Sequence, residues 1–314
     1  MICGTGMAVP EYVLTNAELS RMVDTSDEWI SSRTGIRQRR ICTGEALSEL
    51  AARAAQEALT RAGIEAGQLD LILCATMQGD YVTPSLACQV QQAIGAVCPA
   101  MDLNAACAGF LYALDAAAGY YARGRVRYVL VLGAECMSKH VDWEDRGTCV
   151  LFGDGAGAAV LGPGNGLLAS RLYAQGNVDY LHIPGTPSTF PAAGGQTGKQ
   201  TVHMNGQEIY RFAVQSVCRE VPAALEDAGL GLEAIRYVLL HQANLRILEA
   251  AQARLKIGAE KLPVYLDRYG NTSSASIPLM LGDMDRAGKL DRGDLLVLCV
   301  FGGGLTVCTL VMRW

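Results

Sequence analysis

The segment Asn104-Ala105-Ala106-Cys107-Ala108-Gly109-Phe110 is the most informative part of this chain. One cysteine lies among small residues, directly before an apolar pattern with helical spacing: Leu111, Leu114, Ala117, Ala118 and Tyr121. Cys107 is therefore predicted at a helix N-terminus, where unpaired amides and the positive end of the helix dipole favour thiolate over thiol. Any one of the eleven cysteines is more often a buried structural residue, so the segment needs support from elsewhere.

Two distant segments supply that support. His241 follows the apolar run 237–240 (YVLL), which predicts a buried strand, and sites in α/β folds form at the carboxyl ends of strands. Asn271 lies in a Gly-Asn turn within 269–276 (YGNTSSAS), before a helix-like stretch. Taken alone, a histidine after a strand is usually a satisfied polar residue, and a Gly-Asn-Thr segment is usually only a turn.

Further motifs accompany these segments in a fixed order: 25–36 (TSDEWISSRTGI), 145–148 (DRGT), 152–158 (FGDGAGA) and 301–304 (FGGG). Together with the Cys, His and Asn segments, they resemble β-ketoacyl-acyl-carrier-protein synthase III over nearly the whole chain. The resemblance implies a Cys107, His241 and Asn271 catalytic set, and an oxyanion hole formed by the amides of Cys107 and Gly303.

The composition agrees with an enzyme that buries large cores. The chain has 314 residues, of which 50% are hydrophobic and 18% charged, so disorder is not expected and the length suggests about two domains. The net charge of −5 gives no support to nucleic-acid binding. The cysteines form no CxxC pair, so no metal site is predicted, and the absence of a signal peptide leads us to expect reduced thiols and a cytoplasmic location.

One uncharged stretch, 295–312, reaches the lower length limit for a membrane helix. Gly302, Gly303 and Gly304 interrupt it, and its flanks are rich in β-branched residues. Two buried strands joined at a glycine turn are therefore predicted, and no membrane association.

Helical and strand patterns alternate along the chain. A helix is predicted from Leu47 to about Gly63, strands are predicted at 70–75 and 128–133, and Thr25 with Glu28 predicts a capping box for a short helix at Trp29.

The chain also repeats itself loosely. The FGDG motif at 152 recurs as FGGG at 301, and the strand 70–75 resembles 236–241. The sequence predicts an α/β fold of two pseudo-repeated halves, 1–164 and 165–314, with Pro163 to Gly166 as the seam. The resemblance implies the same arrangement, a thiolase-like fold with α-β-α-β-α layers and the site between the halves.

The resemblance also implies a decarboxylative Claisen condensation. Cys107 would accept an acyl group from coenzyme A, and His241 and Asn271 would donate hydrogen bonds to the enolate formed when a malonyl-acyl-carrier protein loses CO2. The coenzyme A thioester would be a substrate, and no cofactor is expected. The implied partners are an acyl-CoA, malonyl-acyl-carrier protein and a second copy of the chain in a homodimer.

Substrate-binding residues are implied in three groups. For coenzyme A and its pantetheine arm they are Trp29, Arg33, Arg146, Gly206 and Asn244. For the acidic carrier protein they are Arg211, Arg246 and Arg254, with Lys256 nearby, although Arg254 and Lys256 are equally well explained as ordinary solvated charge. For the acyl pocket they are Thr83, Met137, Phe152 and Phe301. The family often has Phe where Thr83 stands, which predicts a wider pocket and puts acetyl as the sole primer in doubt.

Two other function classes stay open at this stage, and the sequence disfavours a third, the degradative thiolases. A condensing enzyme of specialised metabolism would use the same Cys-His-Asn set. A non-catalytic carrier-binding protein would not need that set intact. A degradative thiolase would place a second cysteine in a Cys-x-Gly context, which neither Cys299 nor Cys308 has.

Overall fold

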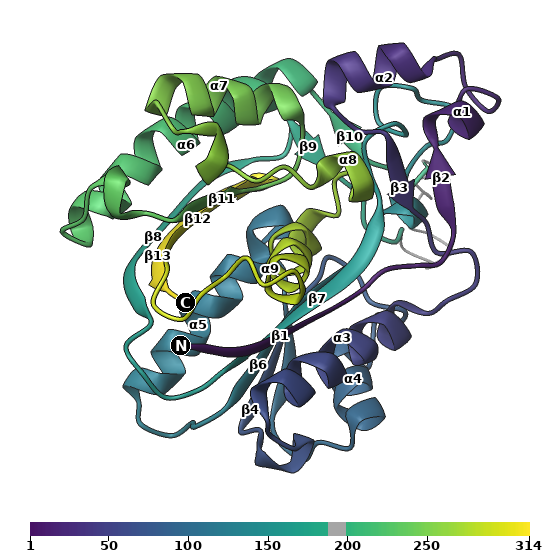
Figure 1. Cartoon of the computed structure of the whole chain (residues 1–314). Coiled ribbons are helices and arrows are strands. Elements are labelled where there is room, and N and C mark those ends of the chain that lie inside the picture. The colour runs from purple at the N-terminus through teal and green to yellow at the C-terminus, as the bar shows by residue number, and fades with distance from the viewer. Residues whose placement is uncertain (188–198) are drawn as a thin grey trace.

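The computed structural model describes residues 1–187 and 199–314. Two mixed β-sheets form its framework (Figure 1). The first sheet has the order β1 (Ile2–Ala8), β7 (Asp154–Leu161), β6 (Val129–Cys136), β4 (Leu71–Ala75) and β5 (Ala100–Leu103). The second has the order β8 (Leu167–Asn177), β13 (Gly304–Arg313), β12 (Leu295–Gly302) and β11 (Tyr237–Leu240).

The two sheets share one pattern of strand pairing. In the first, β1–β7 and β7–β6 are antiparallel and β6–β4 is parallel. In the second, β8–β13 and β13–β12 are antiparallel and β12–β11 is parallel. The predicted repeat matches this pattern, because 70–75 and 236–241 contain β4 and β11. A domain boundary at 164/165 stays a prediction, and it falls in the connection between β7 and β8.

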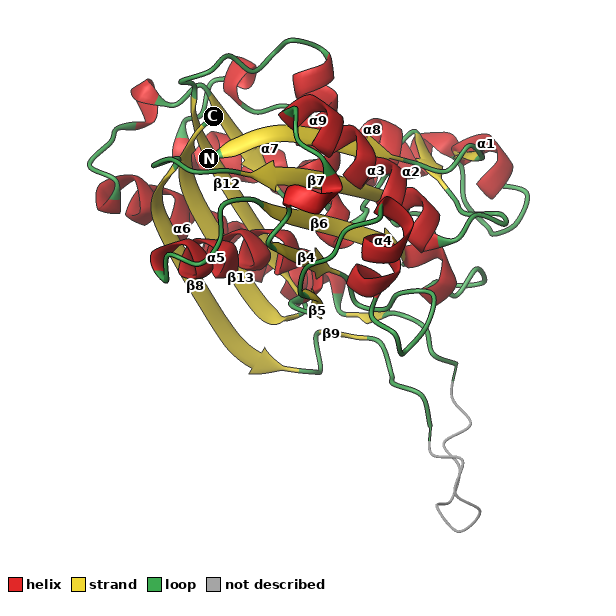
Figure 2. Cartoon of the chain, turned by 90° about the horizontal axis from the view of Figure 1, so that it is seen from below, coloured by secondary structure: helices red, strands yellow, loops and turns green. Residues whose placement is uncertain are grey.

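Helices cover both sheets in layers (Figures 1 and 2). On the outer face of the first sheet lie α3 (Leu47–Ala62) and α4 (Leu86–Ile94). Between the sheets lie α5 (Gly109–Ala122) and α9 (Ser276–Arg286). On the outer face of the second sheet lie α6 (Gly206–Asp227) and α7 (Leu245–Leu255). The predicted α-β-α-β-α arrangement is confirmed.

Smaller elements complete the fold. Two short antiparallel strand pairs are β2 (Val13–Thr15) with β3 (Gln38–Arg40), and β9 (Leu181–His182) with β10 (His203–Met204). The short helices are α1 (Asn16–Leu19), α2 (Asp27–Thr34) and α8 (Leu266–Tyr269). The 3₁₀ turns are η1 (Ala66–Gln68), η2 (Ala106–Ala108), η3 (Met137–His140), η4 (Leu232–Ala234), η5 (Ala259–Lys261) and η6 (Ser273–Ala275).

The central strands are buried on both faces, which explains their continuous apolar runs. Along β12, Leu296, Leu298 and Val300 face the helices between the sheets, whereas Val297, Cys299 and Phe301 face the outer helices. The stretch 295–312 therefore forms strands, as predicted. In the part of the chain that the structure describes, no helix is both long and apolar enough to cross a bilayer.

The helix caps confirm one sequence prediction and correct another. Helix α3 ends at Gly63 in the left-handed conformation, as predicted. The capping box at Thr25 and Glu28 is wrong, because the hydroxyl of Ser26 accepts the hydrogen bond from the backbone N–H of Trp29 at 3.1 Å. The adjacent serine reaches this amide, and Thr25 is one residue too early in the chain to cap α2.

Glycines in the first sheet let the segment after Asn271 approach it closely. A Cβ atom at Gly133 of β6 would lie 2.4 Å from the carbonyl oxygen of Ser274, and one at Gly157 of β7 would lie 2.5 Å from the carbonyl carbon of Pro278. Both neighbours are backbone atoms, so they cannot move aside as a side chain does. The absence of a side chain at these glycines allows η6 and α9 to pack directly against the sheet.

We expect Gly133→Ala to lower the free energy of unfolding by about 1–3 kcal/mol, because the added methyl group overpacks this contact. Gly119→Ala is the matched control: Gly119 lies on the exposed side of α5 with no atom near a Cβ, so this change should raise stability by about 0.5–1 kcal/mol. Urea unfolding of the two variants measures the difference, and equal stabilities would contradict the role assigned to Gly133.

Candidate active site

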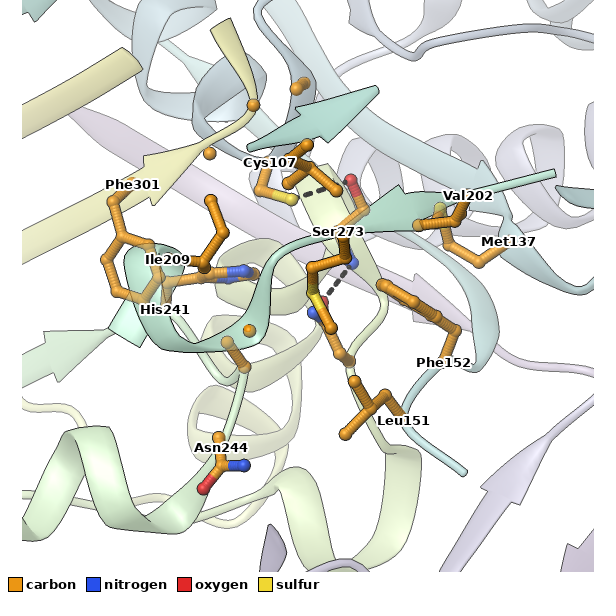
Figure 3. Close-up of a pocket in the computed structure, with 18 of the residues that line it drawn as sticks. Cys107, Met137, Leu151, Phe152, Val202, Ile209, His241, Asn244, Ser273 and Phe301 are labelled. Atoms are coloured by element: carbon orange, nitrogen blue, oxygen red, sulfur yellow. Dashed lines mark hydrogen bonds between the residues drawn. The ribbon is translucent and has the colours of Figure 1, made fainter. Parts of the chain in front are cut away.

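A cavity of about 1160 Å³ lies between the two halves of the chain. Cys107, His241 and Asn271, the residues predicted to form the catalytic set, all line it. They come from η2, from the end of β11 and from the turn before η6, and each is at most 8% exposed. Figure 3 shows Cys107, His241 and Ser273 around one part of this cavity. The structure therefore brings these distant segments together.

Cys107 lies in η2, immediately before α5, which confirms its predicted place at a helix start. The turn between β12 and β13 packs directly against it, and a Cβ at Gly302 would lie 2.8 Å from the Cys107 backbone nitrogen. The amides of Cys107 and Gly303 are close enough to the Cys107 sulfur to act to lower the pKa of its thiol. The hydroxyl of Ser273 lies within hydrogen-bonding distance of the same sulfur, at 3.3 Å (Figure 3).

Burial acts against the thiolate that the helix start at Cys107 is expected to favour. Burial raises the pKa of this thiol to about 11, although hydrogen bonds from Ser273 and from the amides of Cys107 and Gly303 act to lower it. Removal from water penalises the charged form and is the largest of these effects. Since the thiolate is the nucleophile, a thiol at Cys107 has to lose its proton when the sulfur attacks.

His241 is held as a neutral imidazole. Its backbone N–H donates to Cys299 at 2.9 Å, which continues the pairing of β11 with β12, and its ring packs edge-on against Phe301 at 5.1 Å. Burial lowers the pKa of His241 to about 3. The Nδ1 atom is buried and has no hydrogen-bond partner in 1–187 or 199–314. A buried N–H without an acceptor is the rarer defect, so we assign the proton to Nε2.

Asn271 is oriented through its backbone and its side chain. Its N–H donates to Leu151 at 2.8 Å, and its carbonyl accepts from Gly153 at 3.1 Å, which fixes it beside the segment before β7. Its Oδ1 accepts from the backbone N–H of Ser273 at 2.9 Å. Because the side-chain oxygen is used in this turn, the amide NH2 group is left to act as a donor.

The residues predicted to bind coenzyme A lie around a more exposed part of the cavity. Trp29, Arg33, Gly206 and Asn244 line it, whereas Arg146 does not line it but stacks on Trp29. The guanidinium carbons of Arg33 and Arg146 lie 4.8 and 5.3 Å from the centroid of the indole ring. An aromatic ring beside two guanidinium groups is suited to a planar, negatively charged ligand such as a nucleotide.

Only two of the three residues predicted to bind the carrier protein line the cavity. Arg211 and Arg246 are exposed and line the cavity, whereas Arg254 and the neighbouring Lys256 are exposed elsewhere on the surface. Arg211 is paired with Glu208 at 2.6 Å, and Arg246 donates to the carbonyl of Ser32 at 3.4 Å. Two cations of the predicted patch therefore lie at the rim.

Three of the four predicted acyl-pocket residues line the cavity: Met137, Phe152 and Phe301. Thr83 does not, because it lies in an exposed loop before α4. Within one chain the prediction for Thr83 is therefore not met.

Two polar residues beside Cys107 had not been assigned roles from the sequence: Ser273 and Glu135. Glu135 is 2% exposed, and its carboxylate accepts hydrogen bonds from the hydroxyls of Ser273 and Ser274 at 3.4 and 2.8 Å and from the Met77 amide at 3.2 Å. A single acid near the end of the apolar strand β6 was the available signal, since acids are rarely buried without a reason.

A second group of potential ligands, Cys42, Cys136 and Asp154, lies apart from this cavity, with its ligand atoms within 4.8 Å of one another. The carboxylate of Asp154 already accepts from the backbone of Cys42 at 2.8 Å and from the amide and hydroxyl of Ser138 at 2.8 and 2.6 Å. The protein itself therefore supplies hydrogen bonds to both oxygens, which anchors the loop after β3 to the start of β7.

Comparison with known proteins shows which family has this arrangement. The family profile described as 3-oxoacyl-[acyl-carrier-protein (ACP)] synthase III matches residues 101–176, and the profile of its C-terminal part matches 225–314. The curated β-ketoacyl-[acyl-carrier-protein] synthase III of Clostridium acetobutylicum is 46% identical, over 100% of this chain and 98% of that protein.

Solved structures agree with these matches. The 3-oxoacyl-[acyl-carrier-protein] synthase III of Aquifex aeolicus has a TM-score of 0.93 and 43% identity, covering 100% of this chain and 99% of that one. A priming β-ketosynthase of a polyketide biosynthetic pathway also has a TM-score of 0.93, at 34% identity, covering 99% of this chain and 95% of that one.

The duplicated sheets, with the cysteine, histidine and asparagine in one buried cavity between them, define a condensing enzyme of the thiolase fold, an acyltransferase. More narrowly, the chain belongs to the 3-oxoacyl-[acyl-carrier-protein] synthase III family.

The buried neutral His241 leads to a pH-dependent stability. Between pH 6.5, the ordinary pKa of histidine, and pH 3, the unfolded chain binds a proton here that the folded chain does not, so stability falls as the pH falls through this window. From pH 7 to pH 5 the free energy of unfolding of the wild type should drop by about 2 kcal/mol more than that of His241→Gln, which cannot titrate. Urea unfolding at both pH values measures this, and parallel losses would contradict the assignment.

Proposed function

We propose that this chain condenses an acyl-CoA primer with malonyl-acyl-carrier protein, releasing CO2 and coenzyme A and forming a β-ketoacyl-acyl-carrier protein, as the first condensation of fatty acid synthesis. The observation that carries the proposal is the joint placement of Cys107, His241 and Asn271 in one buried cavity. The identities of 46% and 43% to the synthase III enzymes of Clostridium acetobutylicum and Aquifex aeolicus, against 34% to the polyketide ketosynthase, favour fatty acid synthesis over specialised metabolism.

In the first step the sulfur of Cys107 attacks the primer thioester, and coenzyme A leaves. The attacked carbonyl oxygen becomes negatively charged, and the amides of Cys107 and Gly303 are the donors that we assign to it. Their position beside the Cys107 sulfur supports this role. Donors that are already in place stabilise such an oxyanion without having to reorganise.

In the second step a malonyl thioester replaces coenzyme A and loses CO2, which leaves an enolate. Nε2–H of His241 and the NH2 group of Asn271 are the donors that we assign to the enolate oxygen. The neutral state of His241 supports this role, because a neutral ring offers a hydrogen bond without adding a cation to the site. The orientation of the Asn271 amide supports it as well. The enolate carbon then attacks acyl-Cys107, and the sulfur leaves.

Coenzyme A would enter over Trp29, with Arg33 and Arg146 beside the nucleotide and Gly206 and Asn244 along the pantetheine arm. Arg211 and Arg246 would meet the acidic carrier protein at the rim. No further cofactor is proposed, since the thioester itself is the activated substrate.

His241→Ala and Asn271→Ala should separate the two steps. Each variant should still form the acyl-enzyme, but should release CO2 from malonyl thioester about 10²–10³-fold more slowly, since each removes one donor to the enolate oxygen. Intact-protein mass measures the acyl adduct, and released CO2 measures decarboxylation.

Cys107→Ser is the complementary variant, and should lose the adduct. Peptide mapping should place the wild-type adduct on Cys107. An adduct on Cys136 or Cys149, or normal decarboxylation in both alanine variants, would refute the assignment.

A homodimer would explain the exposed edge of the first sheet. Strand β5 ends that sheet, and Met101 in it is 39% exposed; Tyr81, Val82 and Val97 nearby along the chain are 63%, 85% and 90% exposed. An unpaired strand edge with exposed apolar side chains is suited to pairing with another strand. Asp102 of β5 accepts from the first amides of α4, at Leu86 and Ala87, so the Thr83 loop lies beside this edge.

Pairing through β5 would bring Thr83 toward the partner's cavity, and a small residue there would leave room for a longer acyl group. Primers of about four to eight carbons should therefore compete with acetyl-CoA, and Thr83→Phe should shift kcat/KM toward acetyl-CoA about tenfold or more, from about 0.8 kcal/mol per methylene.

The primer series is measured on a protein whose dimeric state is checked by sedimentation. Thr83→Ser is the matched control and should keep the wild-type preference. A single 33.4 kDa species at micromolar concentration, or a tenfold wild-type preference for acetyl-CoA, would contradict the proposal.

A further inference from the structure

The Cys107 thiol needs a proton acceptor that the Cys-His-Asn set does not provide. Cys107 is 8% exposed, and burial raises the pKa of its thiol to about 11, which favours the protonated form. His241 is held neutral by burial, so at neutral pH it is a poor acceptor, and Asn271 does not titrate. The acceptor must therefore be reached through another polar group that touches the sulfur.

In the described residues, one series of hydrogen-bond contacts connects the Cys107 sulfur to a second titratable group, the carboxylate of Glu135. Ser273 Oγ lies 3.3 Å from Cys107 Sγ and 3.4 Å from Glu135 Oε1. The other contacts of Glu135, with Ser274 and Met77, hold its carboxylate in place. Ser273 has a φ of 50°, in the left-handed region that a serine rarely adopts, and such strain is found where a side chain must be aimed at a site.

A hydroxyl group has one proton, so Ser273 cannot donate to both neighbours at once. When Glu135 is ionised, Ser273 donates to its carboxylate and accepts from the Cys107 thiol. When Glu135 is protonated, the carboxylic acid donates to Ser273, and Ser273 donates to the sulfur. The two patterns use the same three side chains and differ by a shift of two protons along the chain.

We propose that Ser273 and Glu135 form a proton relay for Cys107, in which Ser273 passes the thiol proton to Glu135 during acylation and returns it after condensation. The proposal rests on the proposed function, since it assigns the proton movements of that reaction. Ser273 touches the reacting sulfur. Glu135 acts through Ser273, and so positions that hydroxyl and holds the proton.

No net proton or electron is gained or lost by Cys107, Ser273 and Glu135 over one cycle. In acylation, the Cys107 S–H bond breaks, the S–C bond to the acyl group forms, and the proton passes through Ser273 to Glu135; coenzyme A leaves as a thiolate and is protonated by solvent. In condensation, the enolate carbon forms its bond to the acyl carbon, and the C–S bond breaks with its electron pair on Cys107. Glu135 then returns the proton through Ser273, and the thiol is restored.

The surroundings of Glu135 suit a group that changes protonation near neutral pH. Burial raises the pKa of Glu135 to about 8, against hydrogen bonds from Ser274, Met77 and Ser273 that lower it. The titratable groups that face it are the thiol of Cys107 and the thiol of Cys74 on β4. No cation pairs with its carboxylate within 1–187 and 199–314. A proton acceptor works best with a pKa near the working pH.

The test is the pH dependence of acylation, followed as coenzyme A released in a single turnover with acyl-CoA alone. In the wild type the rate should rise with a midpoint near pH 8, as Glu135 ionises. Glu135→Gln keeps the size, and its amide can still pair with Met77 and the two serines, but it cannot take a proton. This variant should lose the rise and acylate about 10²-fold more slowly at pH 8.

Two serine variants distinguish a relay from a structural effect. Ser273→Ala should reproduce the slow, pH-independent acylation, and the double variant with Glu135→Gln should be no slower than the slower single variant. Ser274→Ala is the matched control: Ser274 touches Glu135 but not Cys107, so the rise should remain and move to higher pH, because Glu135 loses a hydrogen bond to its ionised form.

Decarboxylation of malonyl thioester without primer reports on the rest of the site, and should stay within about threefold of wild type in all four variants. An unchanged pH profile in Glu135→Gln, additive losses in the double variant, or equal loss of decarboxylation would overturn the relay. A wild type that never acylates Cys107 would instead overturn the proposed function, so the two failures are distinguishable by mass spectrometry of the wild-type adduct.

Discussion

The close contact between the Cys107 turn and Gly302 is the constraint on which the site depends. Cys107 belongs to the half that contains the first sheet, and Gly302 ends β12 of the second. A side chain at 302 would collide with the Cys107 amide at 2.8 Å, so only glycine lets the two halves meet here. This contact brings the Gly303 amide to the nucleophile, and the glycines of β6 and β7 allow the Asn271 segment to approach from the other side.

Removal from water is the shared electrostatic feature of the site, and it acts in opposite directions on different groups. It raises the pKa of Cys107 and of Glu135, and it lowers the pKa of His241. In all three cases burial therefore favours the neutral form. In such an environment the fixed N–H donors act strongly on any charge that develops during the reaction.

The sequence predicted the elements whose signals are local. The buried strands of 295–312, the helix ending at Gly63, and the placement of Cys107, His241 and Asn271 follow from apolar periodicity, glycine turns and ordered motifs. The raised pKa of Cys107 could not be predicted from its own segment, because desolvation depends on what packs around the sulfur, which includes segments more than 150 residues away along the chain. Ser26 replaced Thr25 as a cap because a one-residue shift changes which hydroxyl reaches the Trp29 amide. Thr83 could not be placed, since its neighbours in the proposed arrangement belong to a second chain.

Arg39 shows how the nucleotide end of the cavity is tied to its buried end. Its guanidinium is completely buried and donates to the carbonyl of Leu14 at 3.3 Å, the side chain of Asn16 at 2.8 Å and the carbonyl of Val150 at 2.7 Å. These partners belong to the β2–α1 segment and to the segment that precedes Phe152 in the cavity wall. Asn16 in turn donates to Asp27 at the start of α2, the helix that presents Trp29 and Arg33. A buried cation with several hydrogen bonds is costly to disturb, because losing any partner leaves a charge unsatisfied. The same side chain therefore fixes α2 relative to the wall beside Asn271, so that a thioester held at Trp29 meets the reacting groups in one defined geometry.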